Sequence, residues 1–116
     1  MSEYTIYHNP RCSKSRQTLA LLEEQGIAPT IVKYLEDVPS VEELSAVLAK
    51  LQKSPADIVR KGEAVYKELG LSAKTLSDAE WLAVFVENPK LIERPIVVKG
   101  DRAVLGRPPE NVKDLF

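Results

Sequence analysis

The N-terminal part of the chain alternates a strand-like, a helix-like and a second strand-like segment, and this order restricts the fold more than any other feature. Residues 3–8 (EYTIYH) form a short run of β-branched and aromatic side chains, which is typical of a strand. Residues 13–25 have the apolar periodicity of a helix, and Gly26 is suited to end it. Residues 30–35 (TIVKYL) predict another strand. Together the three segments predict a right-handed βαβ unit with parallel strands.

The middle of the chain, about residues 36–90, is predicted to be mostly helical. Ser40 with Glu43, and Ser77 with Glu80, have the spacing of a capping box, in which a serine hydroxyl and a glutamate carboxylate cap the first helical turn. The first of these helices is expected to place five apolar residues on one face: Val41, Leu44, Val47, Leu48 and Leu51.

The last part of the chain changes character again. Residues 94–106 (RPIVVKGDRAVLG) predict two strands that form a hairpin around Gly100–Asp101. Residues 108–116 (PPENVKDLF) predict a short closing helix. A βαβ half and a ββα half can share one mixed sheet, which is the layout of an α/β, thioredoxin-like fold. We therefore expect one thioredoxin-like domain over residues 1–116, with a helical insertion at about 36–90 between the two halves.

The composition is that of an ordinary globular protein with no strong charge bias. The 116 residues fit one compact domain, with 44% hydrophobic and 28% charged residues. The net charge of −1 gives no reason to expect general binding to nucleic acid or to a membrane surface. The first residues lack the basic and apolar regions of a signal peptide, and the run WLAVFV is too short to span a bilayer. We expect a cytoplasmic protein.

Cys12 is the only cysteine, and His8 is the only histidine. A single cysteine cannot form an internal disulfide, and one histidine with one cysteine cannot complete an ordinary structural zinc site. We therefore expect no metal site. If Cys12 does redox chemistry, the second thiol must come from another molecule.

Cys12 falls where the first strand meets the first helix. A helix N-terminus offers free backbone N–H groups and a partial positive charge, and both stabilise a thiolate or a bound oxyanion. Arg11, Lys14 and Arg16 add positive charge nearby. A lone cysteine in a small domain is often only a buried packing residue. The loop position and the local charge nevertheless favour a reactive Cys12.

Four other residues are candidates to assist the cysteine. His8 is either a base for Cys12 or a support for the strand end, and we favour the supporting role. Arg94 and Arg107 each precede a proline just outside the two hairpin strands, so the hairpin should bring them together. Arg60 follows a short helix. Several guanidinium groups beside a thiolate would bind a tetrahedral oxyanion, although three unrelated surface arginines remain the alternative.

The sequence resembles the ArsC family, the arsenate reductases linked to glutathione and glutaredoxin. The similar segments occur in order over almost the whole chain: TIYHNPRCSKSRQTL, PTIVKYLEDVPS, IVRKGEAVYKELGL, LIERPIVVKG and LGRPPE. The resemblance implies a thioredoxin-like fold with a helical insertion. It also implies an oxidoreductase that acts on arsenate or a related oxyanion.

The resemblance assigns a role to each candidate residue. Cys12 matches the nucleophile that attacks arsenate. The arginines that match those holding the oxyanion are Arg60, Arg94 and Arg107. The residues that match those lining the same loop and binding substrate are His8, Asn9, Ser15 and Arg16. Glutathione is implied as co-substrate and glutaredoxin as protein partner, with no bound cofactor. Pro95 matches a cis proline beside the active cysteine, so we predict a cis Arg94–Pro95 bond.

Two other functions remain open for a chain of this kind. Spx-type regulators share the fold and bind RNA polymerase, and many carry a second cysteine at the position of Ser15. The serine excludes an internal disulfide switch here, so specific polymerase binding would be needed to support this alternative. A glutathione-dependent thiol transferase would need only Cys12. Transferase activity that persists without Arg94 and Arg107 would favour it.

Overall fold

The computed structural model describes residues 3–116, which form two compact units. The described residues up to Asp37, together with Arg94–Phe116, form one unit, called the sheet unit below. Val38–Glu93 form the other, the helical unit. The expectation that residues 1–116 make a single domain with an insertion at about 36–90 stays a prediction.

The sheet unit is built on one mixed four-stranded sheet in the order β2-β1-β3-β4. Its strands are β1 (Tyr4–Tyr7), β2 (Thr30–Val32), β3 (Ile96–Lys99) and β4 (Arg102–Leu105). Strand β1 pairs in parallel with β2, while β1 with β3 and β3 with β4 are antiparallel. The predicted parallel βαβ unit and C-terminal hairpin are therefore confirmed, and together they give the expected thioredoxin-like layout.

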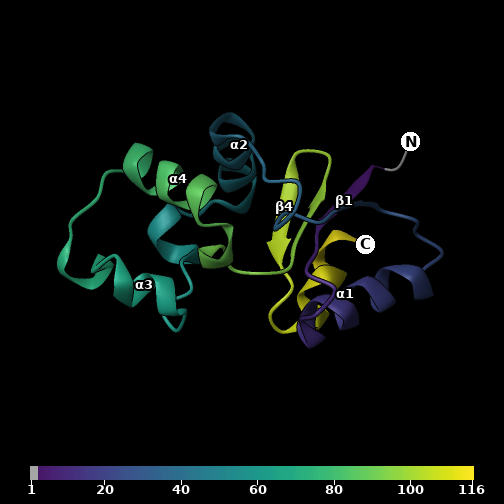
Figure 1. Ribbon diagram of the computed structural model, residues 1–116. Coiled ribbons are helices and arrows are strands. Elements are labelled where there is room, and N and C mark those ends of the chain that lie inside the picture. The colour runs from purple at the N-terminus through teal and green to yellow at the C-terminus, as the bar shows by residue number, and fades with distance from the viewer. Residues whose placement is uncertain (1–2) are drawn as a thin grey trace. The chain divides into compact units, whose positions relative to one another are not determined.

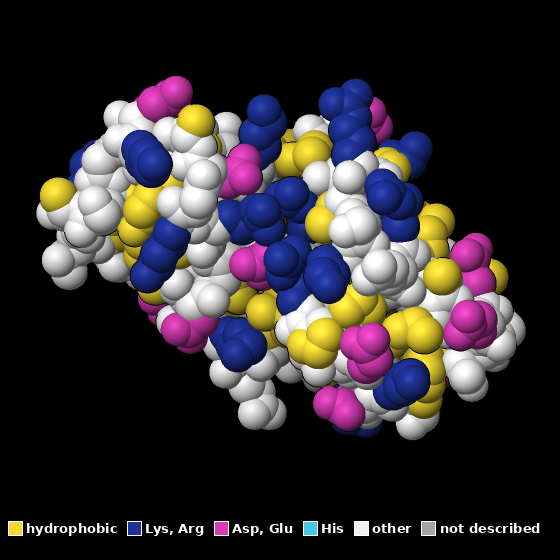
Figure 2. Space-filling view, turned by 90° about the horizontal axis from the view of Figure 1, so that it is seen from below, with side chains coloured by type: hydrophobic (Ala, Val, Ile, Leu, Met, Phe, Trp, Pro, Cys, Tyr) yellow, Lys and Arg dark blue, Asp and Glu magenta, His cyan; other side chains and the backbone are white. Residues whose placement is uncertain are grey.

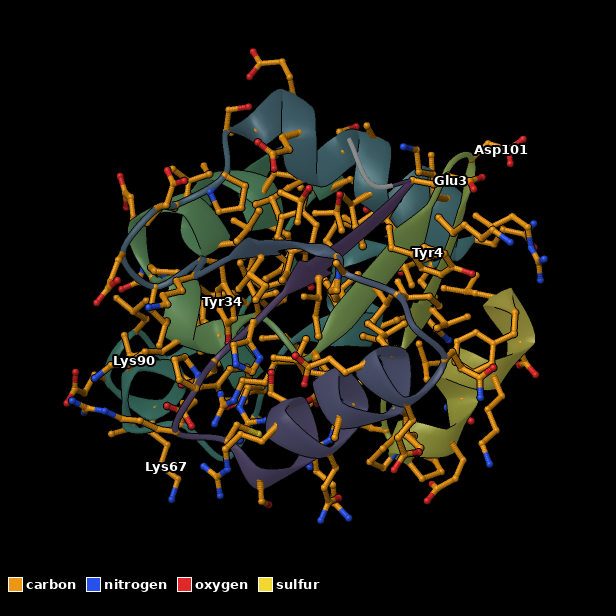
Figure 3. All side chains as sticks on the ribbon, turned by 90° about the vertical axis from the view of Figure 1, so that its right-hand side faces the viewer. Glu3, Tyr4, Tyr34, Lys67, Lys90 and Asp101 are labelled. Atoms are coloured by element: carbon orange, nitrogen blue, oxygen red, sulfur yellow. The ribbon has the colours of Figure 1, made fainter. Side chains whose placement is uncertain are left out.

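The register of the sheet brings four chain segments to the same end. Tyr7 pairs with Val32 on one side and with Ile96 on the other, and Ile96 pairs with Leu105. The residues just after β1, after β2, before β3 and after β4 therefore meet at this end. The hairpin turn, where Gly100 has a φ of +59°, lies at the opposite end, near the labelled Glu3 and Asp101 in Figure 3.

Two helices pack side by side against one face of this sheet. They are α1 (Ser13–Glu24) and the 3₁₀ helix η4 (Pro109–Leu115), which Figure 1 shows adjacent to each other. Their apolar side chains form one core with alternate residues of the strands, namely Tyr4, Ile6, Leu22, Val97, Val112 and Leu115. Gly26, with a φ of +72°, ends α1 as predicted. This core fixes the start of α1 relative to the sheet.

The helical unit contains α2 (Val41–Leu51), α3 (Ala64–Glu68) and α4 (Asp78–Glu87), with 3₁₀ turns η1 (Pro55–Ile58), η2 (Leu71–Ala73) and η3 (Pro89–Leu91). Ser77 and Glu80 form the predicted capping box, and the Ser40 hydroxyl accepts the N–H of Glu43. Four of the five predicted apolar residues of α2 are buried. Val41 is the exception and is 37% exposed, because it occupies the first turn of the helix.

The surface carries both signs of charge. Lysine and arginine side chains lie beside aspartate and glutamate side chains on the face seen in Figure 2, in keeping with the net charge of −1. Across residues 3–116, no helix has the length and apolar character needed to cross a membrane. In the same residues, no group of three His, Cys, Asp or Glu side chains is placed to hold a metal ion.

Candidate active site

Residues 8–12 form the loop that carries the chain from β1 into α1. Cys12 is the N-cap residue of α1, with extended backbone angles of φ −92° and ψ 123°. Its N–H donates to the carbonyl of Asn9 at 3.0 Å, and its own carbonyl accepts the N–H of Arg16 at 3.0 Å. The sequence therefore placed Cys12 correctly at the start of the helix.

The sulfur of Cys12 lies in surroundings that favour the thiolate. The side chain is partly buried, and this burial alone raises the pKa of the thiol. The backbone N–H of Ser15, the guanidinium of Arg94 and the backbone N–H of Lys14 act in the opposite direction and outweigh the burial. The net result is a pKa of Cys12 below that of an ordinary cysteine, so more of the nucleophilic form is present at neutral pH.

Arg94 is the side chain that contacts the cysteine directly. Burial lowers the pKa of Arg94, but its hydrogen bond to Cys12 and its interactions with Tyr34 raise the pKa above the ordinary value, so the guanidinium stays charged. The Arg94–Pro95 bond is cis, as predicted. Tyr34, which is 1% exposed, is a member of the site that sequence reasoning missed.

Arg107 lies next to Arg94, as the hairpin predicted. Its Nη1 donates to the carbonyl of Arg94 at 3.4 Å, and its side chain is exposed to solvent. The Arg107–Pro108 bond is also cis, which the sequence analysis did not predict. The two arginines therefore stand at the same end of the sheet as Cys12.

Gly106 packs closely against Thr18 of α1 and against Pro95. Its N–H donates to the carbonyl of Pro95 at 2.9 Å, and its carbonyl accepts the hydroxyl of buried Thr18 at 3.4 Å. A Cβ at this position would lie 2.5 Å from Thr18 Oγ1 and 2.8 Å from Pro95 Cγ. Only glycine leaves room here for both α1 and the proline, and a lone glycine in the sequence gave no sign of this contact.

His8 and Asn9 of the loop form a buried hydrogen-bonded group with Ser15 in the first turn of α1. His8 Nδ1 and Ser15 Oγ are 2.6 Å apart, and Ser15 Oγ also accepts the N–H of Asn9 at 3.1 Å. Burial, followed by the charges of Lys33 and Arg16, lowers the pKa of His8, so the ring is neutral at neutral pH. This geometry agrees with a supporting role for His8. A direct contact of His8, Asn9 or Ser15 with a substrate stays a prediction.

Arg16 turns back onto the loop. Its Nη1 donates to the carbonyl of Pro10 at 2.9 Å, and the side chain is exposed. The guanidinium therefore holds the backbone just before Cys12, and its role in binding substrate stays a prediction.

Arg60 belongs to the helical unit. Its guanidinium pairs with Glu93 through Nη1 at 2.8 Å and with Glu63 through Nε at 3.6 Å. Its backbone N–H donates to the carbonyl of Leu91 at 2.7 Å. These contacts fix the arginine within its own unit. Its assignment to the oxyanion site stays a prediction.

Within the sheet unit, the arrangement combines a nucleophile with an anion site. A thiolate at a helix N-terminus can attack an electrophilic centre, and the adjacent guanidinium can hold negative oxygens around that centre. A tetrahedral oxyanion satisfies both requirements, because its central atom is electrophilic and its oxygens are charged.

Comparisons of the sequence and of the structure with known proteins all find similarity to one protein family. The sequence model of the ArsC family matches residues 7–115. An arsenate reductase of Haemophilus influenzae is 49% identical over 96% of this chain and 97% of that protein. The uncharacterized protein YfgD of Escherichia coli is 47% identical over 95% of this chain and 93% of that protein. The solved structure of an arsenate reductase from Vibrio cholerae is 54% identical over 97% of each chain, with a TM-score of 0.93.

Proposed function

Because the chain belongs to the ArsC family, we propose that it is a thiol-dependent reductase of arsenate or a closely related oxyanion. One observation carries this proposal: the Cys12 sulfur sits at the N-terminus of α1 and is hydrogen-bonded by the Arg94 guanidinium. A packing cysteine does not need a charged partner of this kind.

In the first step, the Cys12 thiolate attacks the arsenic of arsenate. A sulfur–arsenic bond forms, one oxygen leaves as water after protonation, and arsenic stays in the As(V) state. The backbone N–H groups at the start of α1 and the Arg94 guanidinium stabilise the thiolate before attack. After attack they are placed to stabilise the negative oxygens of the adduct.

The oxyanion is held by guanidinium groups. Arg94 contacts the sulfur, and Arg107 lies beside Arg94, so both can donate paired hydrogen bonds to the arsenate oxygens. Arg60 is proposed as the third arginine on the family resemblance alone. In the structure it is paired with Glu93 and Glu63.

The reducing electrons come from two thiols, of which the chain supplies one. The glutathione thiolate attacks the Cys12 sulfur, and a disulfide forms as the sulfur–arsenic bond breaks. The electron pair of the broken bond stays on arsenic, which leaves as As(III) in arsenite. A glutaredoxin thiol then removes the glutathione from Cys12 and restores the free thiol. Glutathione is kept reduced in the cytoplasm, which is where we propose that the protein acts.

The other residues around the loop and the first turn of α1 hold the cysteine in place. Ser15 joins neutral His8 to the backbone of Asn9, and Arg16 holds the carbonyl of Pro10. We propose that these contacts fix the loop so that its backbone and side chains line the substrate. Such preorganisation lowers the cost of reaching the transition state.

The test combines product formation with trapping of the intermediate. The purified protein is incubated with arsenate, glutathione and glutaredoxin, and arsenite is measured over time. We expect repeated turnover only when all components are present, and at most one arsenite per protein when glutaredoxin is left out. Without glutaredoxin, mass spectrometry should find one glutathione bound to Cys12.

Protection of the thiol gives a readout that does not depend on turnover. Arsenate should slow the alkylation of Cys12, whereas chloride at the same ionic strength should not. Absence of both arsenite formation and protection by arsenate would exclude this function and leave the thiol transferase and the polymerase-binding alternatives to be tested.

A further inference from the structure

A cavity lies beside the cysteine loop. A cavity of about 270 Å³ opens at the C-terminal ends of the parallel strands β1 and β2. It is lined by residues 8–11 of the loop before Cys12 and by Lys33, Leu35 and Glu36 of the turn after β2. All of these residues belong to the sheet unit. The end of two adjacent parallel strands is a common place for ligands in α/β folds.

The walls of the cavity are held by backbone hydrogen bonds. The N–H of His8 donates to the carbonyl of Val32 at 2.8 Å and joins the two segments. The N–H of Glu36 donates to the carbonyl of Lys33 at 2.9 Å and closes the turn that contains Tyr34, labelled in Figure 3. On the other wall, the N–H of Arg11 donates to Asn9 Oδ1 at 3.0 Å. The lining side chains therefore start from fixed backbone positions.

The lining combines both signs of charge with apolar surface. Arg11 and Lys33 supply cationic groups, Glu36 supplies a carboxylate, and Pro10 and Leu35 supply apolar contacts. Such a set suits a small molecule that carries carboxylates, an ammonium group and short apolar stretches. The volume lies just below the usual range for ligand pockets, about 300–1,000 Å³, so a ligand of tripeptide size would be only partly enclosed and would remain partly exposed to solvent.

We propose that this cavity binds the thiol co-substrate, a zwitterionic tripeptide such as glutathione, with Arg11 and Lys33 near its carboxylates and Glu36 near its ammonium group. The inference rests on the proposed function, because that function names the tripeptide as the source of the second thiol. It assigns Lys33, Glu36 and Leu35 to the site, and none of these was identified by the sequence analysis.

The cavity adjoins the loop that leads to the cysteine. Asn9 lines the cavity, and its carbonyl accepts the N–H of Cys12 at 3.0 Å, so the loop turns directly from the cavity to the cysteine. An extended tripeptide spans about 10 Å. Arg94 and Arg107 do not line the cavity, so the tripeptide does not need the guanidinium groups that are proposed to hold the oxyanion.

The first experiment measures binding without reaction. S-methylglutathione keeps the charges of glutathione but cannot form a disulfide. Titration of the full chain, followed by amide NMR, should shift signals of residues 8–11 and 33–36. Lys33→Gln and Glu36→Gln should each weaken binding about threefold to tenfold, as expected for the loss of one partly screened charged contact. Lys113→Gln and Glu24→Gln, with the same charge changes on exposed helix positions, should bind as the wild type does.

A second probe tests the assignment of the ammonium group. N-acetylation of S-methylglutathione removes the ammonium charge and should weaken binding to the wild type. Against Glu36→Gln, the acetylated and free forms should bind equally, because the partner carboxylate is already absent. An equal loss on acetylation in both proteins would overturn this assignment.

The two proposals can fail separately. Binding at residues 33–36 without arsenite formation would support the tripeptide site in the cavity and exclude the arsenate reductase function. Arsenite formation with an unchanged KM for glutathione in Lys33→Gln and Glu36→Gln would exclude the cavity as the tripeptide site and support the reductase function. Absence of S-methylglutathione binding, or shifts confined to residues 94–107, would also reject the cavity.

Discussion

The helices α1 and α4 begin in opposite ways. At α4, the Ser77 hydroxyl accepts the N–H of Glu80 at 3.2 Å, the Glu80 carboxylate returns the bond, and Asp78 adds a further acidic group in the first turn. At α1, the cap residue is Cys12, which supplies no side-chain oxygen; the N–H groups of Lys14 and Ser15 face its sulfur instead, and the first turn has no acidic residue. The two helices are otherwise of similar length.

This difference separates a structural helix start from a chemical one. In α4, side-chain oxygens satisfy the free N–H groups and neutralise the helix dipole, which stabilises the helix. In α1, no side-chain oxygen of the cap residue binds the N–H groups of the first turn. These groups therefore stay available to a sulfur anion and to the oxygens of a substrate. The positive potential at the start of α1 is therefore available for function, and we expect this helix start to be less stable than it would be with a serine cap.

Cys12→Ser should break this distinction most strongly. The variant gives α1 the same type of cap residue as α4, so the protein should be as stable as the wild type or up to about 1 kcal/mol more stable. Arsenite formation should fall by at least about 1,000-fold, because the nucleophile is lost. Denaturant unfolding and the arsenite assay measure the two effects on the same sample. Retained turnover in Cys12→Ser would show that the start of α1 does not carry the chemistry.

Arg94→Gln tests the charge that faces the start of α1. The substitution removes the hydrogen bond and the positive charge beside the sulfur, so the pKa of Cys12 should rise and kcat/KM for arsenate should fall about 100-fold. The pH dependence of Cys12 alkylation measures the first effect. Arg102→Gln is the matched control, since Arg102 lies at the other end of β4 and donates to the carbonyl of Asp114. An unchanged alkylation profile in Arg94→Gln would contradict the proposed contact.

Gly106→Ala tests how the start of α1 is held against the cis proline. The added methyl group would meet Thr18 and Pro95, so the protein should lose about 1–3 kcal/mol of unfolding free energy. Gly62→Ala is the control, because a Cβ there meets no atom within 4 Å. Equal stabilities of the two variants would show that the close packing at Gly106 does not matter.

The same contrast explains what the sequence could predict. The cap residues, the apolar face of α2, the hairpin and the position of Cys12 depend on neighbours in the chain, so periodicity and turn residues were sufficient. The parallel pairing of β1 and β2 followed from the chirality of βαβ units. Tyr34 beside Arg94 and Gly106 against Thr18 depend on the register between distant segments, which a single sequence does not specify.

Ser77→Ala examines the structural helix start alone. Loss of the cap should lower the unfolding free energy by about 1 kcal/mol, because one N–H at the start of α4 loses its acceptor. The kinetics of arsenite formation and the alkylation of Cys12 should match those of the wild type. Altered alkylation would show that the two helix starts are coupled, and the division between structural and chemical starts would have to be revised.

The smallest effect concerns the buried histidine behind the start of α1. Burial, and then the charges of Lys33 and Arg16, hold the pKa of His8 below its ordinary value of 6.5. The unfolded state therefore binds a proton more readily than the folded state, and stability should decrease as the pH falls below 6.5 through the folded pKa. At neutral pH this loss of stability is absent, because the ring is neutral in the folded state and mostly neutral in the unfolded state. His8→Gln removes the titrating group, so unfolding free energies measured from pH 7.5 to pH 5 should decline less steeply than in the wild type. Parallel curves for the two proteins would mean that His8 titrates as it does in water and that its bond to Ser15 does not hold a neutral ring.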